Sequence, residues 1–207
     1  MAAADGPLAA VPSLERAVGE LAAQLSRVTV QVRAGGRSAG AGVVWRHDSL
    51  IVTNAHVATG PGATILLPDG RELRARLLAR DPRRDLAVLS VAEPSLEPAL
   101  HADARGLRPG ELVVAVGHPL GVPYAAALGI VHRAPSGQRG PVGWLHADIR
   151  LAPGNSGGPL ADVSGRIVGI NAMIVNGLGI AVPTHLVERF VHEITAARDP
   201  GGGARAA

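Results

Sequence analysis

The feature that most constrains the fold is a succession of short β-like segments that recur about every ten residues. Gly-, Pro- or charge-rich turns separate them, and most are dominated by Val, Ile, Leu and Ala. They form two runs, about 27–92 and 110–183, joined by a Pro- and charge-rich stretch over about 93–109. The sequence therefore predicts an all-β fold of two small antiparallel barrels joined by a linker. The expected strand segments read TVQV, AGVVW, LIVTN, ATILL, RELRARLLA, DLAVLSV, ELVVAVG, AAALGIVH, WLHADI, GRIVGINAMIV and LGIAVP.

Helical periodicity occurs only near the two ends of the chain. Residues 13–26 carry leucine and valine at three- and four-residue intervals, which predicts a short amphipathic helix. Residues 184–197 predict a closing helix with Thr184 as its N-cap. We expect residues 1–12 and 198–207 to be disordered.

Composition excludes several classes of protein. The formal net charge is +3, every basic residue is arginine, and there is no basic run with interleaved aromatics, so we expect no nucleic-acid partner. The chain has no cysteine, hence neither disulfides nor thiolate metal sites. No uninterrupted apolar stretch reaches about 18 residues, so no membrane span is expected. The first dozen residues do not look like a secretory signal.

The segment PGNSGGPL, residues 153–160, suggests a nucleophilic serine. A serine hydroxyl needs a base beside it and N–H donors aimed at the oxyanion formed on attack. Flanking glycines let the backbone turn tightly, so Gly154, Asn155 and Ser156 are the candidate oxyanion loop, with the N–H groups of Gly154 and Ser156 as donors. Two alternatives are an ordinary Gly-rich turn and the G-x-S-x-G elbow of α/β-hydrolases. The elbow fits less well, because Pro159 and a β-type stretch follow the serine.

A histidine and an acid complete a possible triad. His56 follows an apolar strand in IVTNAHV, and Asp85 opens the apolar strand DLAVLSV. Taken singly, each has a simpler interpretation: a histidine without a role, and a strand-start cap or a partner for Arg83 or Arg84. Together with Ser156 they follow the His, Asp, Ser chain order of chymotrypsin-like enzymes, with the serine in the second run.

The motifs as a set resemble a trypsin-like serine protease of the bacterial HtrA/Deg type. TNAHV, DPRRDLAVLSV, VGHPLG, DIRLAPGNSGGPL and GRIVGINAMIVNGLGIAVP carry the resemblance, which covers about 28–192. It implies two perpendicular six-stranded barrels, with residues 13–197 as one protease domain, and ATP-independent peptide hydrolysis. From the residues given, we expect no PDZ domain of the kind common in that family. The resemblance favours an extracytoplasmic location, periplasmic or secreted.

We therefore expect a serine endopeptidase in which Ser156 attacks, His56 is its base and Asp85 orients His56. Asp148 matches an acid common in the family, but chain order and strand context favour Asp85. The expected partners are polypeptide substrates, with no cofactor and no metal; the sequence leaves the oligomeric state open. His118, in the turn GHPLG, is expected to be structural. An esterase with the same triad and a non-catalytic peptide-binding adaptor are the alternatives.

The specificity pocket is expected between the segment before the serine and the strand after it. Leu151 should face the pocket, which would favour a small aliphatic P1 residue, the residue whose carbonyl is attacked. Arg150 is expected to face outward, toward Asp148; if it entered the pocket instead, an acidic P1 residue would be preferred. The candidate pocket residues are Leu151, Asn171, Ala172, Met173, Ile174, Gly179, Ile180 and Val182.

Overall fold

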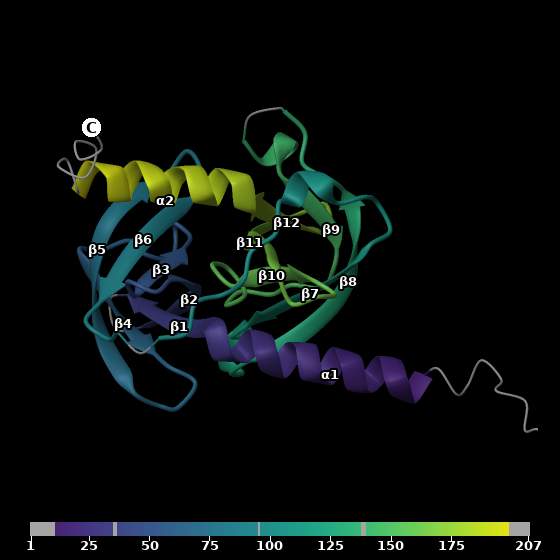
Figure 1. The fold of residues 1–207 in the computed structure, drawn as a ribbon, viewed down its shortest axis with the longest axis horizontal. Helices are drawn as coiled ribbons and strands as arrows, with labels where there is room; N and C mark the ends of the chain where they lie inside the picture. Colours follow the sequence, from purple (N-terminus) through teal and green to yellow (C-terminus); the bar gives the residue numbers. More distant parts are fainter. Residues whose placement is uncertain (1–10, 35–36, 95, 138–139, 199–207) are drawn as a thin grey trace, which may run out of the picture.

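The chain forms two closed six-stranded barrels in the computed structural model, which describes residues 11–34, 37–94, 96–137 and 140–198 (Figure 1). All strand pairs are antiparallel, which confirms the predicted fold class. Barrel one contains β1 (Thr29–Ala34), β2 (Arg37–Arg46), β3 (Leu50–Thr53), β4 (Gly62–Leu66), β5 (Glu72–Asp81) and β6 (Leu86–Val91). Barrel two contains β7 (Leu112–Gly117), β8 (Ala125–Arg133), β9 (Leu145–Asp148), β10 (Pro159–Asp162), β11 (Ile167–Val175) and β12 (Leu178–Pro183).

Side chains along a strand pack alternately into the interior of their own barrel and into the seam between the two barrels. In β3, Ile51 packs inside barrel one, whereas Leu50 and Val52 belong to an apolar cluster that spans both barrels. In β7, Val113 packs inside barrel two and Val114 joins the spanning cluster. Because successive side chains point to opposite faces, a strand of consecutive apolar residues serves two cores at once. The shared cluster holds the two barrels together.

Two α-helices flank the barrels. The first, α1 (Val11–Val28), extends to both sides of the predicted 13–26, and its buried Leu21 and Leu25 join the spanning cluster. The second, α2 (Thr184–Arg198), lies along β11, β12 and β6. Figure 1 shows α1 and α2 on opposite sides of the molecule. None of the described helices is long and apolar enough to span a membrane.

Backbone contacts attach the linker to both barrels. Ala99 N–H donates to the Val44 carbonyl in β2, and His101 pairs with Ile167 in β11. Thr184, predicted as a helix cap, instead uses its hydroxyl on the linker, where it donates to the Ala102 carbonyl at 2.6 Å. The short 3-10 helices are η2 (Ala104–Gly106), η3 (Pro119–Gly121) and η4 (Pro141–Gly143).

The chain ends predicted to be disordered fall mostly outside the described residues. Residues 1–10 and 199–207 lie outside them, while residues 11, 12 and 198 belong to the two helices.

Candidate active site

His56 and Asp85 meet at one edge of barrel one. His56 lies in the turn after β3, and Asp85 directly precedes β6, which pairs with β3. Nδ1 of His56 is 3.0 Å from Oδ1 and 2.8 Å from Oδ2 of Asp85. The His56 backbone N–H also donates to Oδ1, at 3.1 Å. An ionised carboxylate can only accept hydrogen bonds, so Nδ1 carries the proton and Nε2 is left as the basic nitrogen.

The backbone conformation of Asp85 and a hydrogen bond to its carbonyl help to position the carboxylate. Asp85 has φ 50°, in the left-handed region, which aspartate tolerates better than most residues. Its carbonyl accepts from Asn54 Nδ2 at 2.9 Å. The Asp85 side chain is 14% exposed, whereas that of His56 is 50% exposed. The arrangement shields the carboxylate and leaves the imidazole half exposed.

The loop that carries Ser156 is attached to both barrels. The Ser156 carbonyl accepts from Ala41 N–H of β2 at 2.8 Å, and Gly157 N–H donates to the Asn171 carbonyl of β11 at 2.8 Å. Gly157 has φ 85°, and a Cβ there would lie 2.1 Å from the Ala41 oxygen. Only glycine fits this crossing, so the glycine after the serine is required by the close approach of barrel one.

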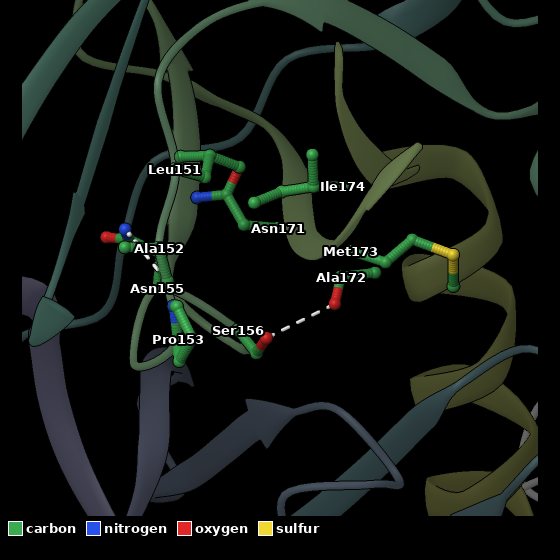
Figure 2. Close-up of a pocket in the computed structure, with 9 residues that line it drawn as sticks. All are labelled: Leu151, Ala152, Pro153, Asn155, Ser156, Asn171, Ala172, Met173 and Ile174. Carbon is green, nitrogen blue, oxygen red and sulfur yellow. Dashed lines mark hydrogen bonds between the residues drawn. The ribbon is translucent and has the colours of Figure 1, made fainter. Parts of the chain in front are cut away.

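Ser156 and His56 are on facing barrels but are not hydrogen bonded to each other in the described part of the chain. The Ser156 hydroxyl donates instead to the Ala172 carbonyl in β11, at 3.2 Å (Figure 2). Catalytic hydrogen bonds are often unformed in the absence of substrate. In this structure the Ser156 hydroxyl is therefore paired with a backbone carbonyl of its own barrel.

The oxyanion loop has two N–H groups available. Among the described residues, neither Gly154 N–H nor Ser156 N–H donates to another backbone carbonyl. Asn155 N–H is committed to the Ala152 carbonyl at 3.0 Å, so Asn155 does not share the donor role expected of the loop. Gly154 has φ 107°, a conformation open mainly to glycine.

A turn from the start of barrel two orients this loop. Leu120 N–H donates to the Pro153 carbonyl at 2.9 Å, and His118 N–H donates to the Gly154 carbonyl at 3.1 Å. A peptide unit carries its C=O and N–H on opposite sides, so fixing the Pro153 carbonyl also fixes the direction of the Gly154 N–H. The sequence showed a turn after a buried strand but contained no signal that this turn contacts the serine loop.

His118 is the buried side chain of that turn. Its Nδ1 accepts from Tyr124 N–H at 3.4 Å, and the two rings meet edge to face. Burial lowers the pKa of His118. The neutral imidazole thus packs at the seam between the barrels.

A cavity of about 220 Å³ lies next to Ser156. Figure 2 shows Leu151, Asn171 and Ile174 gathered at the end of the cavity away from Ser156, with Met173 to one side. The complete lining is Leu151, Ala152, Pro153, Asn155, Ser156, Asn171, Ala172, Met173 and Ile174. The predicted pocket residues from the segment before the serine and from β11 therefore come together around one cavity.

The predicted residues of β12 do not line this cavity. Ile180 and Val182 are buried in the cluster that spans the barrels, so the expectation that either closes the pocket differs from the structure. The reason is that both side chains point to the core face of β12. Gly179 lies behind the wall, where a Cβ would come within 2.9 Å of Leu151 Cδ1.

Arg150 and Asp148 lie outside the cavity. Both are exposed, and neither belongs to the lining. Within the described residues no ion pair joins them, although Arg150 was expected to face Asp148. Asp85, not Asp148, contacts His56. The described residues also contain no group of three or more His, Asp and Glu side chains suited to a metal ion.

Comparison with known proteins identifies relatives across most of the chain. Residues 40–170 match the family described as the trypsin-like peptidase domain. A probable periplasmic serine endoprotease, DegP-like, of Marinomonas sp. (strain MWYL1) is 35% identical over 168 residues, covering 76% of this chain and 35% of the relative. The protein of the same description from Halomonas elongata is 36% identical over 158 residues, covering 71% of this chain and 33% of the relative. The chain thus spans about a third of the length of these relatives.

Solved structures agree with the sequence relatives. The HtrA-type protease AlgW with a decapeptide superposes with a TM-score of 0.77 at 26% identity, over 86% of this chain and 67% of that chain. An AlgW variant with a tripeptide also has a TM-score of 0.77, at 29% identity, over 86% of this chain and 63% of that chain.

Proposed function

The chain belongs to the trypsin-like peptidase family, with relatives of the HtrA/DegP type, and from this premise we propose that it is a serine endopeptidase. The proposed triad is Ser156, His56 and Asp85. The observation that carries the proposal is the contact of His56 Nδ1 with both oxygens of Asp85, on the barrel facing the Ser156 loop. The proposed substrates are unfolded or exposed polypeptides, and the peptides named in the AlgW structures support that class.

Acylation begins with a change of hydrogen-bond partner at Ser156. The hydroxyl leaves the Ala172 carbonyl and donates to Nε2 of His56. Oγ attacks the scissile carbonyl carbon while Nε2 takes the proton, and Asp85 stabilises the imidazolium that forms. The negative charge on the substrate oxygen is held by the N–H groups of Gly154 and Ser156.

The tetrahedral adduct then collapses to an acyl-enzyme. The C–N bond breaks, and the proton on Nε2 of His56 goes to the leaving amine. A water molecule next adds to the acyl carbon and gives its proton to Nε2. The C–O bond to Ser156 breaks, Oγ recovers the proton, and the new carboxyl end of the peptide departs.

Two other functions use the same fold. An esterase needs the same three residues, because ester cleavage is the easier reaction. A peptide-binding adaptor needs none of them, and the His56–Asp85 contact argues against it, since a binding module gains nothing from an oriented imidazole.

Casein hydrolysis by the full chain tests the proposal against both. We expect peptide fragments to accumulate with the wild-type protein and not with Ser156→Ala, which removes the nucleophile. Ester turnover without casein cleavage would favour the esterase. Binding of casein without turnover of either substrate would favour the adaptor.

We also propose that the protein works outside the cytoplasm. The DegP-like relatives are described as periplasmic, which supports this location.

A further inference from the structure

The peptide unit between Ala55 and His56 is hydrogen bonded at both of its polar atoms. The Ala55 carbonyl accepts from Nε of Arg80 in β5, at 2.8 Å. The His56 N–H, on the opposite side of the same peptide unit, donates to Oδ1 of Asp85 at 3.1 Å. Because a peptide unit is planar, hydrogen bonds on its two sides restrict its rotation about the line that joins its two Cα atoms. The backbone that carries the proposed base is therefore held from both sides.

The turn that follows β3 does not use the Ala55 carbonyl for its own hydrogen bonds. The backbone N–H groups of Val57 and Ala58 both donate to the Asn54 carbonyl, at 3.1 Å each. In the part of the chain that the structure describes, no backbone N–H donates to the Ala55 carbonyl. Arg80 therefore supplies the donor for this carbonyl.

One hairpin supplies both contacts to this peptide unit. Arg80 lies near the end of β5, where it pairs with Ala87 of β6, and Asp85 ends the turn that joins the two strands. Within that turn, Oδ1 of Asp81 accepts two backbone N–H groups, at 2.8 and 3.2 Å. The arginine and the acid therefore belong to one hydrogen-bonded unit, and the His56 turn is attached to that unit by both.

Arg80 has no carboxylate partner among the described residues. Arg84, at the far end of the same turn, pairs instead with Glu193 in α2, at 2.7 Å. The hydrogen bond from Arg80 to the Ala55 carbonyl is partly buried, but the Arg80 residue as a whole is exposed. Because water competes for an exposed donor, we expect this hydrogen bond to have a modest effect.

The imidazole of His56 depends on this backbone for its position. The side chain is 50% exposed, and the Ser156 hydroxyl donates to the Ala172 carbonyl rather than to the imidazole. Asp85 binds Nδ1, but the position of the His56 Cα determines where the ring begins. A displacement of reacting groups by about 1 Å can lower a rate by about 10²-fold. A peptide unit that is free to rotate would therefore slow proton transfer.

We propose, resting on the function proposed above, that Arg80 is a positioning residue: its Nε–H holds the peptide unit between Ala55 and His56 and so keeps Nε2 of His56 in position to take the Ser156 proton. Arg80 acts through His56 and does not touch the substrate. The cavity beside Ser156 is lined entirely by residues of barrel two, whereas Arg80 belongs to barrel one. Its loss should therefore slow the chemical step and leave substrate binding unchanged.

A matched pair of variants of the full chain isolates the donor. Glutamine has its amide nitrogen at the same distance along the side chain as Nε of arginine, so Arg80→Gln keeps an N–H donor there. Arg80→Met has a similar length but ends in a methyl group that cannot donate. Arg76→Ala is the control, because Arg76 is an exposed arginine of the same strand without an ion pair in the described residues.

Peptide hydrolysis is measured on a substrate built around the cleavage site that the wild type prefers in a mixed peptide library. Active sites are counted by complete labelling with a fluorophosphonate, so that unfolded protein does not mimic slow chemistry. We expect kcat per active site to fall about three- to tenfold in Arg80→Met, with KM unchanged and the labelling rate lowered by a similar factor. Arg80→Gln should regain most of the loss, and Arg76→Ala should match the wild type.

The proposal is overturned if Arg80→Met has the kcat of the wild type, or if Arg80→Gln is as slow as Arg80→Met. A lower melting temperature with an unchanged kcat per active site would also overturn it, because the contact would then only stabilise the fold. If Arg80→Met does not fold, Arg80→Glu takes its place, since glutamate has the shape of glutamine without the donor.

The readouts keep this proposal separate from the proposed function. If the wild type neither cleaves peptide nor reacts at Ser156, the endopeptidase assignment fails and the role of Arg80 fails with it. If the wild type cleaves peptide in a manner that depends on Ser156 and Arg80→Met is equally fast, only the role of Arg80 fails.

Discussion

Asp85 contacts His56 through both carboxylate oxygens, at 3.0 and 2.8 Å from Nδ1, and through the His56 backbone N–H as well. The acid thus holds the imidazole ring and the turn that carries it. This double attachment supports the proposed role of Asp85 in orienting His56 and stabilising its charged form.

The exchange Asp85→Asn should lower kcat by roughly 10⁴-fold at neutral pH, because the amide can donate to Nδ1 and favour the wrong tautomer. Folding should be retained, since asparagine tolerates the left-handed backbone found at φ 50°. Peptide hydrolysis and thermal melting measure the two effects. Asp148→Asn is the control, and an equal or larger loss of activity there would transfer the third role to Asp148.

Glycine at position 157 should be required for folding. A Cβ would lie 2.1 Å from the Ala41 oxygen, so Gly157→Ala should destabilise the protein by several kcal/mol, beyond the ~1 kcal/mol of a left-handed alanine. Gly177 has a similar φ of 83° with nothing within 4 Å of its Cβ position. Gly177→Ala should therefore show only the smaller loss in urea unfolding. Equal losses would contradict the close crossing of the barrels.

Acid should destabilise the fold in part through His118. Burial lowers its pKa below the ordinary 6.5, so the unfolded chain binds a proton that the folded chain does not. The stability that depends on neutral His118 is complete above about pH 6.5 and is lost as the pH falls. The free energy of unfolding of His118→Asn should decline less between pH 7 and pH 5 than that of the wild type. His146 and His185, whose pKa values burial also lowers, leave some decline in both proteins.

Removing Arg150 should not change P1 selection. The side chain is exposed and outside the cavity, so Arg150→Ala should give the wild-type cleavage profile on a mixed peptide library. A dominant preference for Asp or Glu at P1 that is lost in Arg150→Ala would show that the guanidinium enters the pocket.

Much of the fold could be predicted because the alternation of side chains between the two faces is a local property of each strand. Two runs of short apolar segments indicated two barrels, and the chain order of His56, Asp85 and Ser156 indicated a cleft between them. The strand alternation expected of the segment before the serine placed Leu151 in the cavity and Arg150 outside it, and this placement holds although β9 ends at Asp148. These inferences need no knowledge of long-range contacts.

Other features depend on contacts between distant segments. Ile180 and Val182 were expected at the pocket, but alternation alone does not say which face of β12 meets the core. The turn at His118 contacts the serine loop across 36 residues of sequence, from position 118 to position 154. No local sequence pattern predicts this contact.

The central claim is that Ser156 is a nucleophile activated by His56. Reaction with a fluorophosphonate, followed by intact-mass measurement and peptide mapping, tests it most directly, because the reagent forms a covalent bond only with an activated hydroxyl. The account predicts a single adduct on Ser156 in the wild-type protein, far slower labelling in His56→Ala, and none in Ser156→Ala. A folded wild-type protein that stays unlabelled, or an adduct that persists in Ser156→Ala, would contradict it.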